Sequence, residues 1–123
     1  MARILIIEDD PHLGLLYATE LRREGHEVEN ALDGAAALAA IDRRPPAPPD
    51  LIVLDIKMEP MDGLEVLGEI RRRLRSVPVV INTAYPSFKA DFSTWGADAY
   101  VVKSSDTSEL HRVIDELLTS PPG

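Results

Sequence analysis

Residues 4–11 read Ile-Leu-Ile-Ile-Glu-Asp-Asp-Pro, an apolar run that passes directly into acids and a proline. Four apolar residues without alternation predict a short strand that is covered on both faces, as in a parallel sheet. Asp10 followed by Pro11 is typical of a helix N-cap and the first helical position. The stretch therefore predicts a buried strand that turns at once into a helix, as in α/β proteins.

The same alternation of strand and helix continues along the chain. Further strands are expected at 28–31, 51–54, 77–81 and 100–102, the first of them with a weak pattern. Helices are expected from 11 to about 25, from 33 to about 43, from 63 to about 74, at 86–95, and from 106 or 107 onward. Right-handed crossovers then place helices on both faces of the sheet. The expected fold is α/β: a doubly wound (βα)5 three-layer sandwich around a five-stranded parallel sheet.

Length and composition fit one domain. The chain has 123 residues, no cysteine, and 21 acidic against 13 basic side chains, for a net charge of −8. The absence of cysteine excludes disulfides and thiolate metal sites, and so acidic a surface repels nucleic acid. No apolar run is long enough to span a membrane, and acids at 8–10 do not fit a signal peptide. We expect a cytoplasmic domain over residues 1–119, with 120–123 as a tail or the start of a linker.

Polar residues follow four of the five predicted strands. They are Glu8, Asp9 and Asp10 after the first, Asp55 after the third, Asn82 and Thr83 after the fourth, and Lys103 after the fifth. In a doubly wound sheet the functional site lies beyond the carboxyl ends of the strands, so these side chains are expected to converge. Clustered carboxylates need a counter-charge, and oxygen ligands of this kind suit Mg²⁺. A lysine and a threonine nearby would hold phosphoryl oxygens, so the set predicts phosphoryl transfer onto an acid.

Five segments resemble those of one known family. ILIIEDDP, LIVLDIKM with MDG after it, VVINTA and ADAYVVK are similar, in order and spacing, to the receiver domains of two-component response regulators, such as the chemotaxis receivers. The resemblance implies a flavodoxin-like fold with strand order 2-1-3-4-5. It implies a signalling switch that accepts a phosphoryl group from a sensor histidine kinase or phosphotransfer protein. It also implies a downstream protein target or a fused output domain, and a chain that assists its own phosphorylation and dephosphorylation without being a turnover enzyme.

The resemblance assigns roles around a phosphoacceptor, which would be Asp55. Glu8 and Asp9 would be the acidic pair that holds Mg²⁺ (or Mn²⁺), Asp9 directly and Glu8 through water. Asp55 itself and the backbone carbonyl of Lys57 would complete the protein's metal ligands.

The resemblance also assigns a switch. Thr83 and Lys103 would contact the phosphoryl oxygens, and Tyr100 would be the rotameric partner of Thr83, turning from exposed to buried. Tyr85 is bulky enough to shield the phosphoryl group from water. Tyr85 and Lys57 are therefore expected to tune the site, with slow autodephosphorylation as the result.

Two positions depart from the pattern of the family. Glu59 stands where the family often has proline, with Pro60 next, which predicts a different turn in the site loop. Ser104 follows Lys103 where the family usually has a proline in cis. Because a cis bond to a non-proline residue costs about 3–4 kcal/mol, we expect the Lys103–Ser104 bond to be trans.

Other functions are weighed against the same residues. A phosphatase of the haloacid dehalogenase type also uses an aspartate nucleophile with Mg²⁺, but it needs a second acid where this chain has Lys57. A receiver-like interaction module that no longer cycles through phosphorylation stays open as the alternative, because of the altered positions Glu59 and Ser104. The intact set of acids, threonine and lysine favours the switch.

Overall fold

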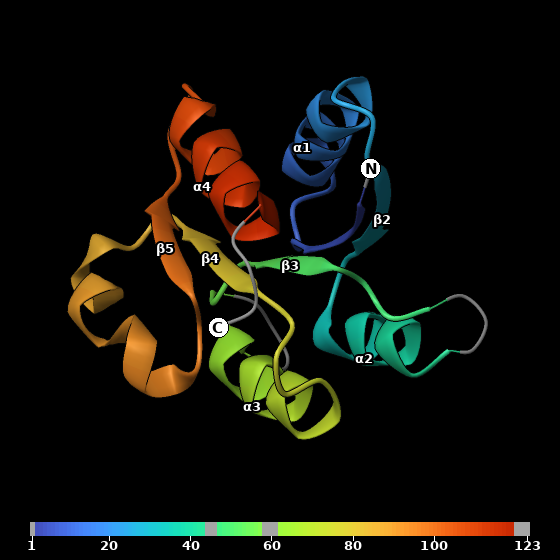
Figure 1. The fold of residues 1–123 in the computed structure, drawn as a ribbon. Helices are drawn as coiled ribbons and strands as arrows, with labels where there is room; N and C mark the ends of the chain where they lie inside the picture. The colour runs from blue at the N-terminus through green and yellow to red at the C-terminus, as the bar shows by residue number, and fades with distance from the viewer. Residues whose placement is uncertain (1, 44–46, 58–61, 120–123) are drawn as a thin grey trace.

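The computed structural model describes residues 2–43, 47–57 and 62–119, and Figure 1 draws the fold. Within these residues the predicted order of strands and helices is confirmed. The elements are β1 (Arg3–Ile7), α1 (Pro11–Arg23), β2 (Glu27–Ala31), α2 (Gly34–Asp42), β3 (Leu51–Leu54), α3 (Gly63–Arg73), β4 (Val79–Thr83), the 3₁₀ helix η1 (Pro86–Trp95), β5 (Ala99–Val102) and α4 (Ser108–Thr119). None of the helices in the described ranges is both long and apolar enough to span a bilayer. The expected tail at 120–123 lies outside the described residues.

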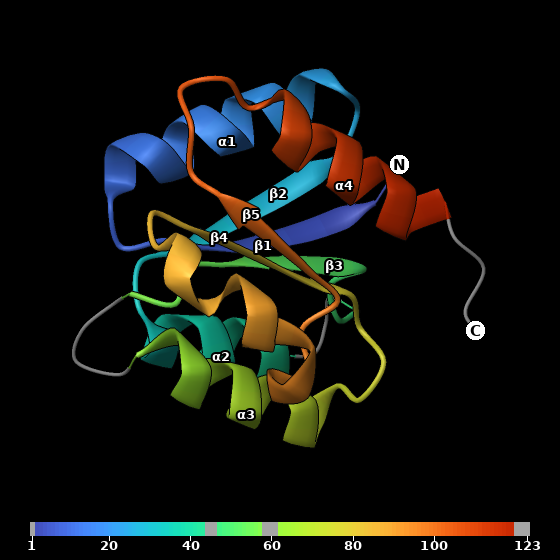
Figure 2. The same ribbon diagram turned by 90° about the vertical axis from the view of Figure 1, so that its left-hand side faces the viewer.

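The strands form one parallel sheet in the order β2-β1-β3-β4-β5, which confirms the predicted order. Helices α1 and α4 cover one face of the sheet, while α2, α3 and η1 cover the other (Figure 2). The molecule is therefore the expected three-layer sandwich. The central strands β3 and β4 are buried along their whole length, as their unbroken apolar sequences predicted.

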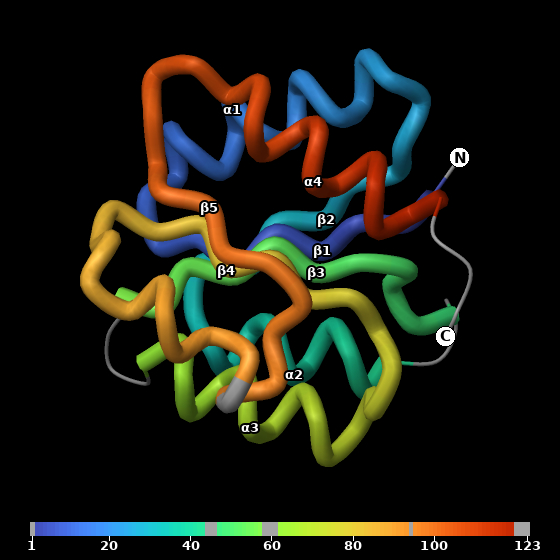
Figure 3. The backbone as a smooth tube through the Cα atoms, turned by 60° about the vertical axis from the view of Figure 1, so that its left-hand side comes forward, coloured from blue at the N-terminus to red at the C-terminus, as the bar shows by residue number. Residues whose placement is uncertain are grey.

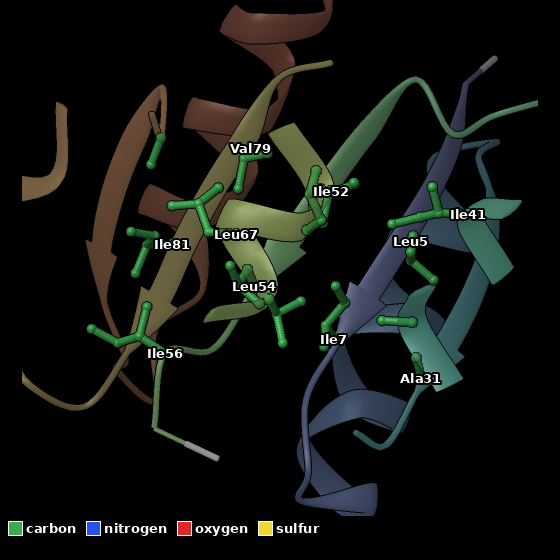
Figure 4. Packing of buried hydrophobic residues seen from close by; sticks show 14 of the residues in the cluster. Leu5, Ile7, Ala31, Ile41, Ile52, Leu54, Ile56, Leu67, Val79 and Ile81 are labelled. Carbon is green, nitrogen blue, oxygen red and sulfur yellow. The ribbon is translucent and has the colours of Figure 1, made fainter. Parts of the chain in front are cut away.

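Alternation along the strands builds a separate core on each face of the sheet. In β1, Leu5 and Ile7 join the core under α2, α3 and η1, whereas Ile4 and Ile6 join the core under α1 and α4. Figure 4 shows part of the first core, where side chains of β1, β3 and β4 meet Leu67 of α3. The same alternation decides which face each strand-end side chain takes, and this positions the site.

Aspartates cap three of the helices. Asp10 accepts hydrogen bonds from the backbone N–H groups of His12 and Leu13, as expected for the start of α1. Asp33 and Asp62 cap α2 and α3 in the same way. Because Asp10 caps α1, Glu8 and Asp9 are the acids of this stretch that can take part in a site at the end of β1.

The boundaries of β4 differ from the prediction. The strand begins at Val79 rather than at 77, and it continues through Asn82 and Thr83, which were expected to follow it. Pro78 has no N–H with which to enter the ladder of backbone hydrogen bonds, which accounts for the late start. Thr83 is therefore held by the sheet itself.

The segment after β4 also differs, because η1 is a 3₁₀ helix. Helical spacing predicts that Phe88, Phe92 and Trp95 share one face, which packs against the sheet or, as the alternative, lies in part on a docking face. With about three residues per turn, Phe92 and Trp95 align, whereas Phe88 is displaced toward the surface and keeps a ring contact with Trp95, with the centroids 5.8 Å apart. Phe92 and Trp95 pack against the first core, whereas Phe88 is 41% exposed, so the prediction of packing against the sheet was wrong for Phe88.

Candidate functional site

The carboxyl ends of the strands bring the predicted site residues to one edge of the sheet. Glu8 and Asp9 follow β1, Asp55 follows β3, Thr83 ends β4, and Lys103 follows β5. Strand register aligns the first acids, because the residue before Glu8 pairs with the residue before Asp55. Glu8, Asp55 and Lys103 each lie two positions after a residue of the core under α1 and α4, so alternation sends all three to that face.

Lys103 connects the two buried acids. Its Nζ lies 2.7 Å from Glu8 Oε1 and 2.9 Å from Asp55 Oδ2. Glu8 is 3% exposed and Asp55 is 5% exposed. The N–H of Asp10 donates to Glu8 and the N–H of Lys57 donates to Asp55 Oδ1. These donors compensate the buried charges, which would otherwise be strongly unfavourable.

The pKa values of both Glu8 and Lys103 are raised in this cluster, but for different reasons. Burial raises the pKa of Glu8 to about 7, although hydrogen bonds from Lys103 and the Asp10 N–H lower it and the charge of Asp55 raises it. Burial alone would lower the pKa of Lys103, but hydrogen bonds to Glu8 and Asp55 outweigh burial and raise that pKa. Lys103 therefore stays protonated at neutral pH, while Glu8 titrates close to neutral pH and a further cation would favour its ionised form.

Carboxylate oxygens of Glu8, Asp9 and Asp55 lie within 4.8 Å of one another. Asp9 is exposed, so the cluster opens to solvent on that side. When all three acids are ionised, their charge exceeds that of Lys103 by two. Three hard oxygen donors with this excess of negative charge fit a divalent cation such as Mg²⁺. The backbone of Lys57 reaches Asp55 through its N–H, and a ligand role for its carbonyl stays a prediction.

Thr83 is fully buried, and its hydroxyl oxygen makes no hydrogen bond among the described residues. Its carbonyl accepts a hydrogen bond of 2.7 Å from the N–H of Lys103, which ties the two strand ends together. An unpaired buried hydroxyl costs about 1–3 kcal/mol. The hydroxyl is therefore a donor that an added acceptor would satisfy.

Tyr100 of β5 is 5% exposed, and its hydroxyl donates a hydrogen bond to the backbone carbonyl of Tyr85. The predicted switch residue thus takes the buried arrangement. Tyr85 is 41% exposed, and Lys57 Nζ lies 5.4 Å from its ring centroid, a cation–π distance. The two residues expected to tune the site therefore lie together.

Two further residues with polar groups, Asn82 and Tyr17, lie beside this site. The side chain of Asn82 is buried, and it lines a small cavity together with Tyr17 of α1. An asparagine after the apolar run at 79–81 was a signal in the sequence. Tyr17 gave none, because it fits the apolar stripe of its helix.

The two departures from the family pattern have different outcomes. Glu59 and Pro60 lie outside the described residues. Ser104 lies in the loop from β5 to α4, where its Oγ accepts a hydrogen bond from the N–H of Asp106. A trans Lys103–Ser104 bond stays a prediction.

A buried aspartate after the third strand, with an acidic pair, a threonine and a lysine at the same sheet edge, is the arrangement of a receiver domain. The sequence model of the response regulator receiver domain matches residues 4–115. This chain belongs to the response regulator receiver domain family.

Individual relatives agree with this assignment. The transcriptional regulatory protein TcrA of Mycobacterium tuberculosis is 36% identical over 110 residues, which are 88% of this chain and 42% of that protein. The response regulator TrrA of Thermotoga maritima, in complex with Mg²⁺–BeF, is 39% identical with a TM-score of 0.84, over 95% of this chain and 99% of that one. TrrA in complex with the histidine kinase ThkA gives the same identity and TM-score over 97% of this chain and 100% of that one. The chain thus spans less than half the length of the regulator TcrA.

Proposed function

We propose that this receiver domain is a phosphorylation-dependent switch, which accepts a phosphoryl group on Asp55 from a partner histidine kinase or phosphotransfer protein, with Mg²⁺ as cofactor. The observation that carries the proposal is the buried contact of Lys103 Nζ with both Asp55 and Glu8. A nucleophile and a cation that can hold phosphoryl oxygens then meet at one point. The complex of TrrA with ThkA supports a histidine kinase as donor.

In the transfer, a carboxylate oxygen of Asp55 forms a bond to phosphorus. The phosphorus–nitrogen bond of the donor's phosphohistidine breaks, and the imidazole leaves. The Lys57 N–H and the Lys103 ammonium orient Asp55 before the donor arrives, which lowers the entropic part of the barrier. Bound Mg²⁺, held by Glu8, Asp9 and Asp55, would neutralise charge on the phosphoryl oxygens. Mn²⁺ would suit the same oxygen ligands.

Phosphorylation adds acceptors beside two donors. The Lys103 ammonium is placed to pair with a phosphoryl oxygen, and the Thr83 hydroxyl gains the partner that it lacks. Movement of Thr83 toward the phosphoryl group favours the buried position of Tyr100, which its hydrogen bond to the Tyr85 carbonyl also holds. The phosphoryl group thereby changes the partner-binding face around β5 and η1.

The phosphoryl group is lost by hydrolysis, with water attacking phosphorus and the Asp55 carboxylate leaving. Each cycle consumes one phosphoryl group from the partner, so the chain acts as a phosphoacceptor rather than as a turnover enzyme. Tyr85 and Lys57, which lie together and line a pocket with Ile56, would limit the access of water. We expect slow autodephosphorylation for this reason.

Output is proposed to pass through protein. TcrA is a transcriptional regulatory protein of which this chain spans 42%, so a fused output domain or a separate downstream protein fits the relatives. The acidic charge of −8 does not favour direct contact with nucleic acid. We also propose a cytoplasmic location, which a chain without cysteine fits.

The decisive experiment is incubation with acetyl phosphate and Mg²⁺, followed by intact mass. We expect the gain of one phosphoryl group, lost in Asp55→Asn. Asp10→Asn is the matched control, because Asp10 neighbours the acidic pair but caps α1, and asparagine caps equally well. No gain of mass in the native chain would instead support the interaction module that does not cycle through phosphorylation.

A further inference from the structure

Asn82 shares a face of the sheet with the acids and the lysine of the site. Val80 packs in the core under α1 and α4, and alternation sends Asn82 to the same side. The residue before Asn82 pairs with the residue before Asp55, so the two lie next to each other on adjacent strands. Asn82 is also one of four buried polar or charged residues in the described part of the chain, the others being Glu8, Asp55 and Thr83.

Asn82 lies along the path that the Lys103 side chain takes to reach Glu8 and Asp55. Lys103 extends from the end of β5, whereas its partners Asp55 and Glu8 extend from β3 and β1. Strand β4 lies between β5 and β3. The lysine side chain therefore crosses the end of β4, on the face to which Asn82 belongs. The backbone of Asn82 pairs with Val101, two residues before the lysine.

Tyr17, in the helix that covers this face, lies beside Asn82. The tyrosine is buried in α1, in the core on the face of the sheet to which Asn82 belongs. Both residues line a cavity of about 10 Å³ that Ser104 and Thr107 of the β5–α4 loop also line. That volume suits a single water molecule. Thr107 donates to Glu20 of α1, so the same helix holds this loop, which rises from β5 to the layer of α1 and α4 (Figure 3).

Packing alone does not account for this pair. Burial of an amide and a phenol is unfavourable unless they are hydrogen bonded. An apolar residue at 82 would continue the sequence of β4, and phenylalanine at 17 would fill the same space in α1, without that requirement. A satisfied polar pair also restricts its neighbours to one arrangement more strongly than apolar contacts do. Its place beside the reacting groups points to a role in the site.

We propose that Asn82, held by Tyr17, is a positioning residue for Lys103. The inference rests on the proposed function and adds a residue to the same site. Asn82 supports the lysine side chain where it crosses β4, and thereby directs the ammonium first between Glu8 and Asp55 and then to a phosphoryl oxygen. Tyr17 fixes the orientation of the Asn82 amide, and neither residue touches the reacting atoms.

The test compares Asn82→Val and Tyr17→Phe with the native chain, using acetyl phosphate and Mg²⁺. We expect the phosphorylation rate constant at saturating donor to fall about three- to tenfold, the effect of losing one orienting hydrogen bond. Mg²⁺ affinity should not fall, because the acidic ligands are intact and a displaced ammonium opposes the metal less. Asn30→Val is the matched control: Asn30 lies on the same face of the sheet beside Gly14 of α1, but on the edge strand β2. It should react at the native rate.

A Lys103→Arg background separates positioning from general stability. If Asn82 acts through the lysine, Asn82→Val should cause little further loss of rate in that background. An equal loss in both backgrounds, or native rates in both single variants, would overturn the inference and leave the proposed function standing. A native chain that gains no phosphoryl group would overturn the proposed function and the inference with it. Thermal unfolding identifies a variant that does not fold, and the milder Tyr17→Phe then decides.

Discussion

Lys103 Nζ lies 2.9 Å from Asp55 Oδ2 although the strand between them, β4, contributes neither residue. The same ammonium is 2.7 Å from Glu8, so one cation serves two buried acids. When a phosphoryl oxygen on Asp55 attracts Lys103, Glu8 loses its counter-charge. A divalent cation on Glu8 and Asp9 replaces that charge, so metal binding and phosphorylation are expected to support each other.

Removal of the lysine charge should move metal affinity and reactivity in opposite directions. In Lys103→Met, the acidic cluster loses the ammonium that contacts Glu8 and Asp55, so we expect Mg²⁺ to bind more tightly. The phosphorylation rate should fall about a hundredfold, because a donor to the phosphoryl oxygens is gone. Calorimetric titration with Mg²⁺ and intact mass after acetyl phosphate measure the two effects. Lys89→Met, on the exposed surface of η1, should leave both unchanged; weaker Mg²⁺ binding in Lys103→Met would contradict the prediction.

The raised pKa of Glu8 predicts how the stability of the metal-free protein depends on pH. Its pKa is about 7 in the fold against 4.5 in the unfolded chain, so the folded state binds the extra proton between these values. The contribution of Glu8 to stability therefore falls as pH rises from 4.5 to 7, by about 3 kcal/mol in all. Urea unfolding in the presence of EDTA measures this slope. Glu8→Gln should flatten it, and Mg²⁺ should reduce it; a slope that Glu8→Gln leaves unchanged would assign it to other groups.

The main parts of the site were predictable because they depend on topology. Asp55 and Lys103 each follow an apolar strand, and parallel strands deliver their carboxyl ends to one edge. What depends on side-chain packing was not predictable. To predict that the Lys103 side chain crosses β4, the register of three strands must be known. To predict that Tyr17 lies against Asn82, the placement of α1 on the sheet must be known. The outward turn of Phe88 follows from a 3₁₀ geometry that α-helical spacing does not reveal.

Loss of the Tyr100 hydroxyl should separate phosphorylation from its consequence. Tyr100→Phe leaves the Tyr85 carbonyl without its donor, at a cost of about 1 kcal/mol. We expect a native phosphorylation rate but faster amide hydrogen exchange in η1, with a smaller change on phosphorylation; Tyr100→Ala should show the same more strongly. Tyr17→Phe is the matched control and should alter the rate but not exchange in η1. If Tyr100→Phe lowers the phosphorylation rate itself, the hydroxyl acts in transfer and not in the switch.

The exposed ring of Tyr85 should set the lifetime of the phosphoaspartate. Tyr85 and Lys57 line a pocket of about 300 Å³ with Ile56, which directly follows Asp55, and Lys57 Nζ lies 5.4 Å from the ring. Tyr85→Ala opens this side to water, so hydrolysis should be several-fold faster, and Lys57→Ala should have a smaller effect in the same direction because it only releases the ring. The lifetime is measured by intact mass after removal of acetyl phosphate. Phe88→Ala removes an equally exposed ring from the same pocket, 41% for each, but three residues farther along the chain. Its lifetime should stay native; an equal acceleration would mean that the pocket as a whole, and not the ring of Tyr85, excludes water.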